Sequence, residues 1–217
     1  MNARSRAPKK LDHATNKSKQ KRAKLRIIGG QWRSRMLPIP ELEGLRPTPD
    51  RVRETLFNWI NAYVPGAKCA DLFCGSGALG LESLSRSAKS CVFVDASRVV
   101  TQQMQQNLAT LGCKDALTLN QDALTLLKLP LDSLQESQPN LADKAPFDLV
   151  FIDPPFRKGW VENILPLLTQ GWLAEGALVY LEMEKETPLP SITQSWDLLK
   201  EKTAGQLTYR LFQVHTH

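Results

Sequence analysis

The 217-residue sequence predicts an α/β fold built on a mostly parallel seven-stranded sheet that ends in an antiparallel C-terminal hairpin, with a small β-hairpin extension at the N-terminus. Two observations carry this prediction. From residue 48 onward, short apolar runs alternate with amphipathic stretches of helical length, which is typical of βαβ units. A glycine-rich loop also stands between the first run and the helix that follows it. The length suffices for one such domain with a small appendage.

Five short apolar runs are expected to form the parallel strands, because buried strands of a parallel sheet lack polar alternation. They lie at 70–73, 90–95, 117–120, 147–152 and 177–182. Two further segments, 195–199 and 206–212, alternate in polarity around Gly205 and predict the hairpin. The polar, proline-containing stretch 128–146 is expected to be a loose insertion.

The helices between these strands carry end signals. Thr48 suits the N-cap of the helix that begins the domain, with Pro49 at its first position and Asp50 in its first turn. Ser97 is expected to cap a later helix, and Gly112 lies just past its end.

Charge is distributed unevenly along the chain. The formal net charge is +6, but residues 1–35 hold 12 Lys and Arg against one acid, which leaves residues 36–217 with a net charge of −5. A basic segment of this kind predicts contact with a polyanion, or a solvated tail that only aids solubility. We expect 1–25 to be a disordered basic arm, 26–47 the hairpin extension and 48–217 the main domain.

Cysteine and histidine positions exclude several classes of site. The four cysteines, Cys69, Cys74, Cys91 and Cys113, form no C-x-x-C pair, and the histidines lie near the termini. Zinc binding and Cys/His or Ser/His/Asp catalysis are therefore disfavoured, and buried free thiols in a reducing compartment are favoured. With neither an apolar leader nor a run long enough for a membrane span, the sequence predicts a cytoplasmic protein without membrane contact.

The segment after the basic arm combines Trp32 with Arg26, Arg33 and Arg35 around Gly29-Gly30. Cations suit phosphates and an aromatic face suits a base, so the mixture is typical of nucleic-acid contact. The alternative, that Trp32 anchors the hairpin to the main domain, is equally compatible, and both can hold. Three further arginines near the first helix face either substrate phosphates or solvent: Arg46, Arg51 and Arg53.

The loop Gly75-Ser76-Gly77-Ala78-Leu79-Gly80 matches G-x-G-x-x-G between a predicted strand and a predicted helix, and Asp95 ends the next strand. Glycines let the backbone approach a ligand closely, the helix N-terminus offers N–H groups, and the acid suits a ribose diol. These features suit any cofactor that carries adenosine, and they do not separate NAD from S-adenosylmethionine.

Three details favour S-adenosylmethionine. Asp71 ends the first strand, where an acid attracts a cationic amino group but would repel a pyrophosphate. Asp122 follows the third strand, where a side chain can meet the adenine amino group. The stretch Asp153-Pro154-Pro155-Phe156 has no use in hydride transfer, and no core histidine is present to donate a proton in a dehydrogenase.

Asp153-Pro154-Pro155-Phe156 follows the fourth strand, which the two prolines end because neither can donate to a sheet ladder. An acid, two carbonyls and an aromatic ring are thereby placed at the carboxyl edge of the sheet, where open α/β folds bind ligands. Taken alone, this stretch is best explained as a rigid turn with a solvated acid. The glycine loop upstream favours a binding site instead.

In these motifs the chain resembles the class I S-adenosylmethionine-dependent methyltransferases, which have a Rossmann-like fold. Residues 71–77 resemble their motif I, and 153–156 resemble the (D/N)-P-P-(Y/F) motif of enzymes that methylate exocyclic base amines. The stretches 26–33, 45–48 and 50–57 are similar to the N-terminal part of the RsmD family, the bacterial 16S rRNA (guanine(966)-N(2))-methyltransferases.

The resemblance implies S-adenosylmethionine as cofactor, S-adenosylhomocysteine as product, no metal, and a monomeric enzyme whose partner is 16S ribosomal RNA within a small subunit or assembly particle. The implied catalytic residues are Asp153, Pro154, Pro155 and Phe156. The implied cofactor-binding residues are Asp71, Phe73, Gly75, Ser76, Gly77, Asp95, Ala96, Asp122, Ala123 and Asp153. The implied RNA contacts are Arg26, Trp32, Arg33, Arg35, Arg46, Arg51, Arg157 and Lys158.

In this interpretation Asp153 and the Pro154 carbonyl each accept one N–H of the target amine, so that its lone pair points at the sulfonium methyl. Phe156 stacks on a base held out of its RNA context. For Arg157 and Lys158 a solvated loop is an equally good explanation. Glu182, at the end of the fifth strand, either helps to line the site or faces solvent. Adenine-N6 methylation of DNA and catalytically silent RNA binding or ribosome assembly are the alternative functions.

Overall fold

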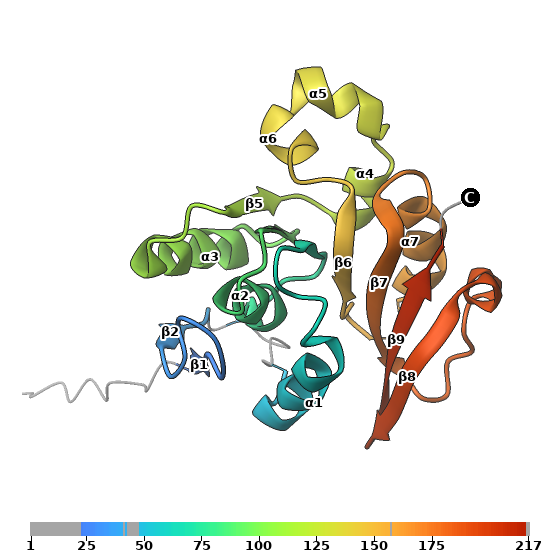
Figure 1. Cartoon of the computed structure of the whole chain (residues 1–217), viewed down its shortest axis with the longest axis horizontal. Coiled ribbons are helices and arrows are strands. Elements are labelled where there is room, and N and C mark those ends of the chain that lie inside the picture. Colours follow the sequence, from blue (N-terminus) through green and yellow to red (C-terminus); the bar gives the residue numbers. More distant parts are fainter. Residues whose placement is uncertain (1–22, 41, 43–47, 157, 216–217) are drawn as a thin grey trace, which may run out of the picture.

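The structure, a computed structural model, describes residues 23–40, 42, 48–156 and 158–215 (Figure 1). Its centre is a seven-stranded sheet with the order β5-β4-β3-β6-β7-β9-β8. The parallel strands are β3 (Lys68–Asp71), β4 (Ser90–Asp95), β5 (Ala116–Asn120), β6 (Phe147–Ile152) and β7 (Leu173–Glu184). The antiparallel strands β8 (Asp197–Ala204) and β9 (Leu207–Val214) form the C-terminal hairpin. The predicted fold class is confirmed.

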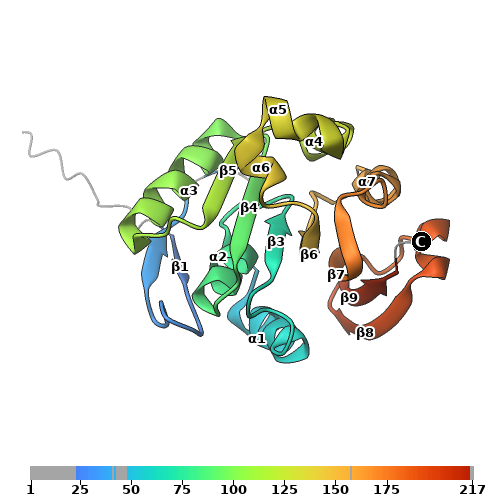
Figure 2. The same cartoon turned by 45° about the horizontal axis from the view of Figure 1, so that its top comes forward.

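Helices cover both faces of the sheet (Figure 2). One face packs against α1 (Asp50–Ile60), α2 (Ala78–Ser85) and α3 (Arg98–Leu111). The other packs against α4 (Ala123–Leu127), α5 (Leu134–Ser137), α6 (Pro139–Ala142) and α7 (Trp160–Leu168). Two short 3-10 helices complete the described structure, η1 (Leu131–Ser133) and η2 (Ser191–Ser195).

The two faces explain why the strands lack polar alternation. In β7, Leu178 and Tyr180 enter the core beneath α1 and α2, whereas Val179 and Leu181 enter the core beneath α4 to α7. Successive side chains of a strand point to opposite faces, so a sheet covered on both sides requires apolar residues at every position. None of the helices in the described ranges is long and apolar enough to cross a membrane.

A separate two-stranded sheet precedes the main domain. Its strands β1 (Lys24–Arg26) and β2 (Met36–Pro38) pair antiparallel, and β1 begins two residues before the predicted start of the extension at 26. Gly30 has a φ of +73°, and a Cβ there would lie 1.8 Å from the carbonyl oxygen of Ser85, so only glycine fits this close approach to α2. Trp32 is half-buried against the same core as α1 and α2, which supports its role as an anchor.

A buried carboxylate joins this small sheet to α2. Glu82, in α2, is 0% exposed and accepts hydrogen bonds from the Ile28 backbone N–H at 2.9 Å and from Arg86 Nε at 2.8 Å. The Arg86 guanidinium also lies 4.9 Å above the ring centre of Phe57, which belongs to α1.

Arg53 extends the same network into α1. It is 1% exposed, its Nη1 lies 3.5 Å from Glu82, and its Nη2 donates to the Arg26 carbonyl at 2.8 Å and to Asp50. The expectation that Arg53 faces phosphates or solvent is therefore wrong. We call Glu82, Arg53, Arg86 and Asp50 the Glu82 network, because the three elements meet through these side chains.

Two other predictions about local structure are wrong. Pro49, not Thr48, is the N-cap of α1, and no side-chain hydrogen bond caps the helix, because the side chain of proline has no acceptor. The stretch 128–146 contains η1, α5 and α6 rather than a loose loop, because Leu134 and Leu141 are both buried in the core on that face. Ser97 does accept a hydrogen bond from the Val100 N–H, as predicted for a cap.

The Glu82 network predicts a large stability effect. Replacing Glu82 with Gln leaves two arginines without their buried counter-charge, which typically costs about 3–5 kcal/mol. We expect Glu82→Gln to lower the free energy of unfolding measured by urea titration by roughly 3 kcal/mol. The matched control is Glu136→Gln on the exposed surface of α5, for which we expect less than about 0.5 kcal/mol. Equal effects in the two variants would contradict this account.

Candidate active site at the carboxyl edge of the sheet

Four acids gather where the parallel strands end. Asp71 and Asp95 are the last residues of β3 and β4, Asp153 directly follows β6, and Glu182 lies near the end of β7. Strand β3 pairs with β4 on one side and β6 on the other, so the order of the strands reverses there. Open α/β sheets bind ligands outside the carboxyl ends at such a reversal.

The glycine loop between β3 and α2 brings backbone close to this reversal. Gly77 has a φ of +75°, and a Cβ there would lie 2.0 Å from Met104 Cε in α3. A Cβ on Gly80 would lie 2.3 Å from the ring of Phe93, so this glycine lets α2 pack directly on β4. Ser76 is buried within the loop, and Gly75 donates its N–H to Asp95. The loop therefore presents backbone rather than side chains to a ligand.

Asp71 is a buried acid without a cationic partner in its hydrogen-bond set. Its Oδ2 accepts from the Gly80 N–H at 3.1 Å. Burial, together with the charges of Asp153 and Asp95, raises the pKa of Asp71 to about 7, although the Gly80 hydrogen bond opposes this shift. An ammonium group placed beside the carboxyl would favour its ionised form. The site thus fits the amino group of a methionine moiety.

Asp95 and Asp122 lie along the same edge. Asp95 accepts from the N–H groups of Ser97 at 2.8 Å and Gly75 at 3.0 Å, which fixes both carboxylate oxygens. Asp122 caps α4 by accepting from the Thr125 N–H at 2.9 Å. The Asn120 side chain ties the ends of β4 and β5 together by donating to the carbonyls of Asp95 and Ala96. Each acid keeps lone pairs that can accept from a ribose or an adenine amine.

The remaining predicted cofactor residues border this arrangement. Phe73 is half-buried and packs edge-on against Trp160 with ring centres 5.5 Å apart, Ala96 is exposed beside Asp95, and Ala123 is buried at the start of α4. The structure therefore brings all of them to one edge of the sheet. Among the described residues, no cluster of three or more His, Cys, Asp or Glu side chains could hold a metal ion.

Asp153 and Glu182 are neighbours across the sheet. The parallel register pairs Ile152 with Leu181, so the next residues, Asp153 and Glu182, lie side by side. Glu182 is 3% exposed and accepts a hydrogen bond from the Tyr180 hydroxyl at 2.8 Å, so of the two alternatives for this residue solvent exposure is wrong. Burial raises the pKa of Asp153 to about 6. Burial and the charge of Asp153 raise the pKa of Glu182 to about 8.

Two hollows lie beside the residues that follow Asp153. One hollow of about 60 Å³ is lined by Pro154, Pro155, Phe156 and Glu182, with Lys158 at its border. Phe156 is 47% exposed and also borders a wider hollow of about 860 Å³ that reaches the tip of the C-terminal hairpin. An aromatic ring left this exposed beside two hollows is available for stacking.

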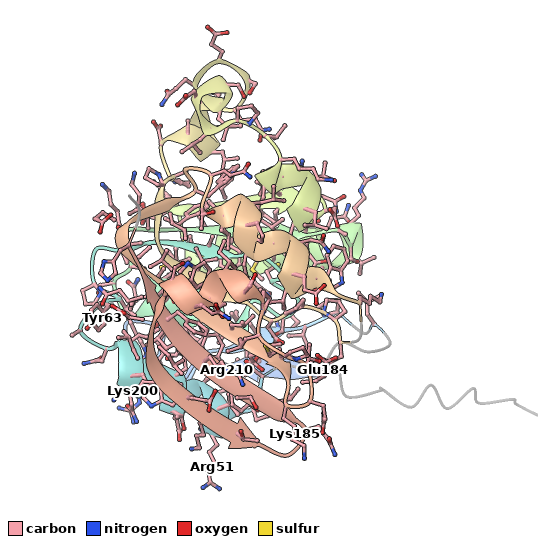
Figure 3. The ribbon with its side chains drawn as sticks, turned by 90° about the vertical axis from the view of Figure 1, so that its right-hand side faces the viewer. Arg51, Tyr63, Glu184, Lys185, Lys200 and Arg210 are labelled. Carbon is pink, nitrogen blue, oxygen red and sulfur yellow. The ribbon has the colours of Figure 1, made fainter. Side chains whose placement is uncertain are left out.

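A cavity of about 310 Å³ lies between α1 and the hairpin, with Tyr180 and Tyr209 among its lining residues and Arg51 and Lys202 as its cations. Arg51 and Lys200 project at the same end of the molecule (Figure 3). Sequence analysis missed Tyr180, Tyr209 and Lys202. The available signal is the alternation of β8 and β9, in which Lys202 pairs with Tyr209.

The predicted RNA contacts fall into two groups. Arg33 and Arg35 are exposed after β1, where Arg26 is already paired with Asp50 at 2.6 Å. Arg51 and Lys158 border the hollows described above. Arg46 and Arg157 lie outside the described residues.

Comparisons with known proteins place this arrangement. Residues 25–213 match the family model described as Conserved hypothetical protein 95. The Ribosomal RNA small subunit methyltransferase D of Escherichia coli strain K12 is 49% identical over 191 residues, which cover 87% of this chain and 89% of that protein. The chain belongs to the RsmD family.

Other RsmD relatives agree. The Ribosomal RNA small subunit methyltransferase D of Haemophilus influenzae is 46% identical over 195 residues, 88% of this chain and 95% of that protein. A solved structure described as a putative methyltransferase yhhF from Escherichia coli superposes with a TM-score of 0.77 at 46% identity, and it covers 90% of this chain and 100% of that one. The fold of this RsmD-family chain is accordingly the Rossmann-like methyltransferase fold.

The buried charge of Asp71 predicts a pH-dependent stability cost in the ligand-free protein. Its folded pKa of about 7 lies above its unfolded value, so stability falls as pH rises from about 4 to 7 and is level above that. Asp71→Asn removes this cost. We expect the variant's gain in unfolding free energy to be near zero at about pH 4 and to reach roughly 2–4 kcal/mol at about pH 8.

Urea titrations at the two pH values measure this gain. Asp132→Asn, which removes an exposed carboxylate in η1, is the matched control and should show no such widening. A gain for Asp71→Asn that does not change with pH would show that the buried charge carries no cost.

Proposed function

We propose that the protein transfers the methyl group of S-adenosylmethionine to the exocyclic N2 amine of a guanine in 16S ribosomal RNA, the family target being guanine 966. One observation carries the proposal: Asp153 and the prolines that follow it stand at the carboxyl edge of β6, next to the glycine loop and Asp71 on β3. An acceptor for an amine and a cradle for a sulfonium cofactor are thus neighbours.

The cofactor half of the site uses residues that the fold already fixes. S-adenosylmethionine supplies a methyl group activated by its sulfonium charge. The buried carboxyl of Asp71 suits the cofactor's amino group, and Asp95 suits its ribose diol. Asp122, which follows β5 and caps α4, suits the adenine amine. The Gly75–Gly77 backbone lets the ligand approach closely.

The catalytic half positions the amine. The lone pair of an aromatic amine is delocalised into the ring, so the enzyme must favour a pyramidal nitrogen. Asp153 is ionised above its pKa of about 6 and accepts one N–H, while the Pro154 carbonyl accepts the other. Asp153 does not need to remove a proton from the amine before methyl transfer, because the methylated nitrogen can lose that proton afterwards. The exposed ring of Phe156 stacks on the base, which is worth roughly 1–3 kcal/mol.

The choice of substrate rests on the relatives. The Escherichia coli and Haemophilus influenzae relatives are named as small-subunit ribosomal RNA methyltransferases, and both match this chain over most of their length. We assign two sets of residues to RNA binding accordingly. Beside the small sheet, RNA contacts Arg26, Arg33, Arg35 and the half-buried Trp32. At the hollows, it contacts Arg51 and Lys158. Arg46 and Arg157 are assigned to RNA from the sequence alone.

The role of Asp153 predicts the loss of one modified nucleoside. When the Asp153→Ala variant replaces the protein in cells that lack it, the target guanine should remain unmethylated. The rate of methyl transfer should fall at least roughly 100-fold, because the acceptor for the amine is gone. Asp153→Asn is the matched control, since its amide oxygen can still accept the N–H and should retain more activity. Mass spectrometry of nucleosides from 16S ribosomal RNA measures the product. N2-methylguanosine that persists at this position without the protein would refute the proposal.

The role of Arg33 and Arg35 predicts a change in salt dependence. Each phosphate contact contributes about 0.7–0.9 to the slope of log affinity against log salt, so replacing both arginines with Ala should reduce the slope by about 1–2. Filter binding to a 16S fragment across a salt series measures it. Lys114 and Lys128, which are exposed before β5 and just after α4, form the control pair. An unchanged slope in the arginine variant would remove the small sheet from the RNA interface.

A further inference from the structure

The acid beside Asp153 has a defined neighbourhood that the proposed mechanism does not use. Glu182 is paired with Tyr209 of β9 on one side of β7. On the other side it lies next to Asp153, because the preceding residues, Ile152 and Leu181, are paired. The three residues therefore form a row across the sheet edge. Tyr180 lies two positions earlier on the same face of β7, and its hydroxyl donates to Glu182 Oε1 at 2.8 Å. One carboxylate oxygen is thereby held, and the side chain is kept in place.

Glu182 also borders the hollow next to the proposed amine site. It lines this hollow together with Pro154, whose carbonyl accepts from the target amine in the proposed mechanism, and Phe156, whose ring stacks on the base. The groups that act on this carboxyl are Asp153 and Tyr180, and neither is a cation. The Glu182 side chain is 3% exposed, and its neighbours include no cation. Its ionised carboxyl therefore lowers the stability of the fold unless a ligand supplies hydrogen-bond donors.

The chemistry of the bases identifies that ligand. Guanine presents two adjacent donors, the exocyclic amine and the ring N1–H. Adenine presents its amine next to a ring N1 that can only accept. Two neighbouring carboxylates accept hydrogen bonds when they are ionised, so they complement guanine and oppose adenine.

We propose that Glu182 is the residue that selects guanine: while Asp153 accepts from the exocyclic amine, Glu182 accepts a hydrogen bond from the ring N1–H. This inference rests on the proposed function. It assigns the choice of base to β7 and leaves methyl transfer to the residues after β6. Tyr180 acts as a positioning residue, because it holds the carboxyl of Glu182.

The ionisation of Glu182 adds a second consequence. Accepting from N1–H requires the carboxylate, and a bound donor favours that form. Since the ligand-free pKa is about 8, guanine use should strengthen as pH rises toward that value. The other titratable groups facing Glu182 are Asp153, with a pKa of about 6, and the hydroxyls of Tyr180 and Tyr209, whose pKa values are raised; Lys202 lies beside Tyr209 on β8.

The decisive experiment compares two bases in one RNA. A 16S fragment carries either guanine or 2-aminopurine at the target position; 2-aminopurine keeps the 2-amino group, but its N1 has no hydrogen and accepts. Wild-type protein should prefer guanine by roughly 10–100-fold in kcat/KM, in line with the usual worth of a paired base contact. In Glu182→Gln, the Tyr180 hydroxyl keeps the amide oxygen and the amide N–H₂ faces the base. The preference should then disappear or reverse, with guanine reduced roughly 10–100-fold.

Glu175→Gln is the matched control, because Glu175 lies at the other end of β7 with 64% of its side chain exposed, and its preference should equal that of the wild type. A Glu182→Gln protein that loses activity on both bases by the same factor, and so keeps the wild-type preference, overturns the inference while the proposed function stands. A wild-type protein that methylates neither guanine nor 2-aminopurine overturns the proposed function itself.

Wild-type protein alone provides a test that needs no folded variant. Its kcat/KM on guanine should rise as pH approaches about 8, whereas on 2-aminopurine it should fall over the same range, because the N1 of that base accepts from the protonated carboxyl. Parallel pH profiles for the two bases would overturn the assignment.

Discussion

The buried carboxylate of Glu82 is the interaction on which the arrangement of the candidate active site depends. Through Arg53, Arg86 and the Ile28 N–H it joins α1, α2 and the small N-terminal sheet. Helix α2 begins directly after the glycine loop, so fixing the helix also fixes the backbone that a cofactor must approach. A structural carboxylate that is fully buried needs several charged and hydrogen-bonding partners to offset its desolvation, and Glu82 has them.

The acids at the carboxyl edge have the opposite character. Asp71 accepts from a single backbone N–H, and Glu182 accepts from a hydroxyl with another acid beside it. Burial raises the pKa of each, which means that the ligand-free fold retains these groups at a cost in stability. Strain of this kind at a cleft is typical of functional sites, because a ligand of the right charge or donor pattern relieves it. The distribution of partners thus distinguishes the structural acid from the acids that we propose bind ligands.

The strands and the acids at their ends could be predicted from the sequence, because they depend on local patterns of apolar and polar residues. The runs 90–95 and 147–152 are strands at the predicted residues, and Asp71, Asp95 and Asp153 stand at strand ends as strand-length reasoning requires. The burial of Arg53 could not be predicted from the sequence, because it depends on an ion pair with Glu82, which lies 29 positions later in the chain. The helices within 128–146 were not predicted, because the two buried leucines that anchor them to the core, Leu134 and Leu141, are surrounded in the sequence by polar residues. Long-range pairing and sparse apolar anchors leave little trace in local periodicity.

The same limit applies to the choice of base. Residues 153–156 form an uninterrupted stretch, so their resemblance to amine-methylating enzymes is visible in sequence, but an acceptor for an exocyclic amine serves adenine and guanine alike. Discrimination requires a group that meets the neighbouring ring nitrogen, and such a group must come from an adjacent strand. The register of β6 against β7 places Glu182 beside Asp153, and the hydroxyl of Tyr180 holds its carboxyl in place. If the two proposals hold, the residues for methyl transfer are encoded within one strand end, whereas the choice of base is encoded in the alignment of two strands.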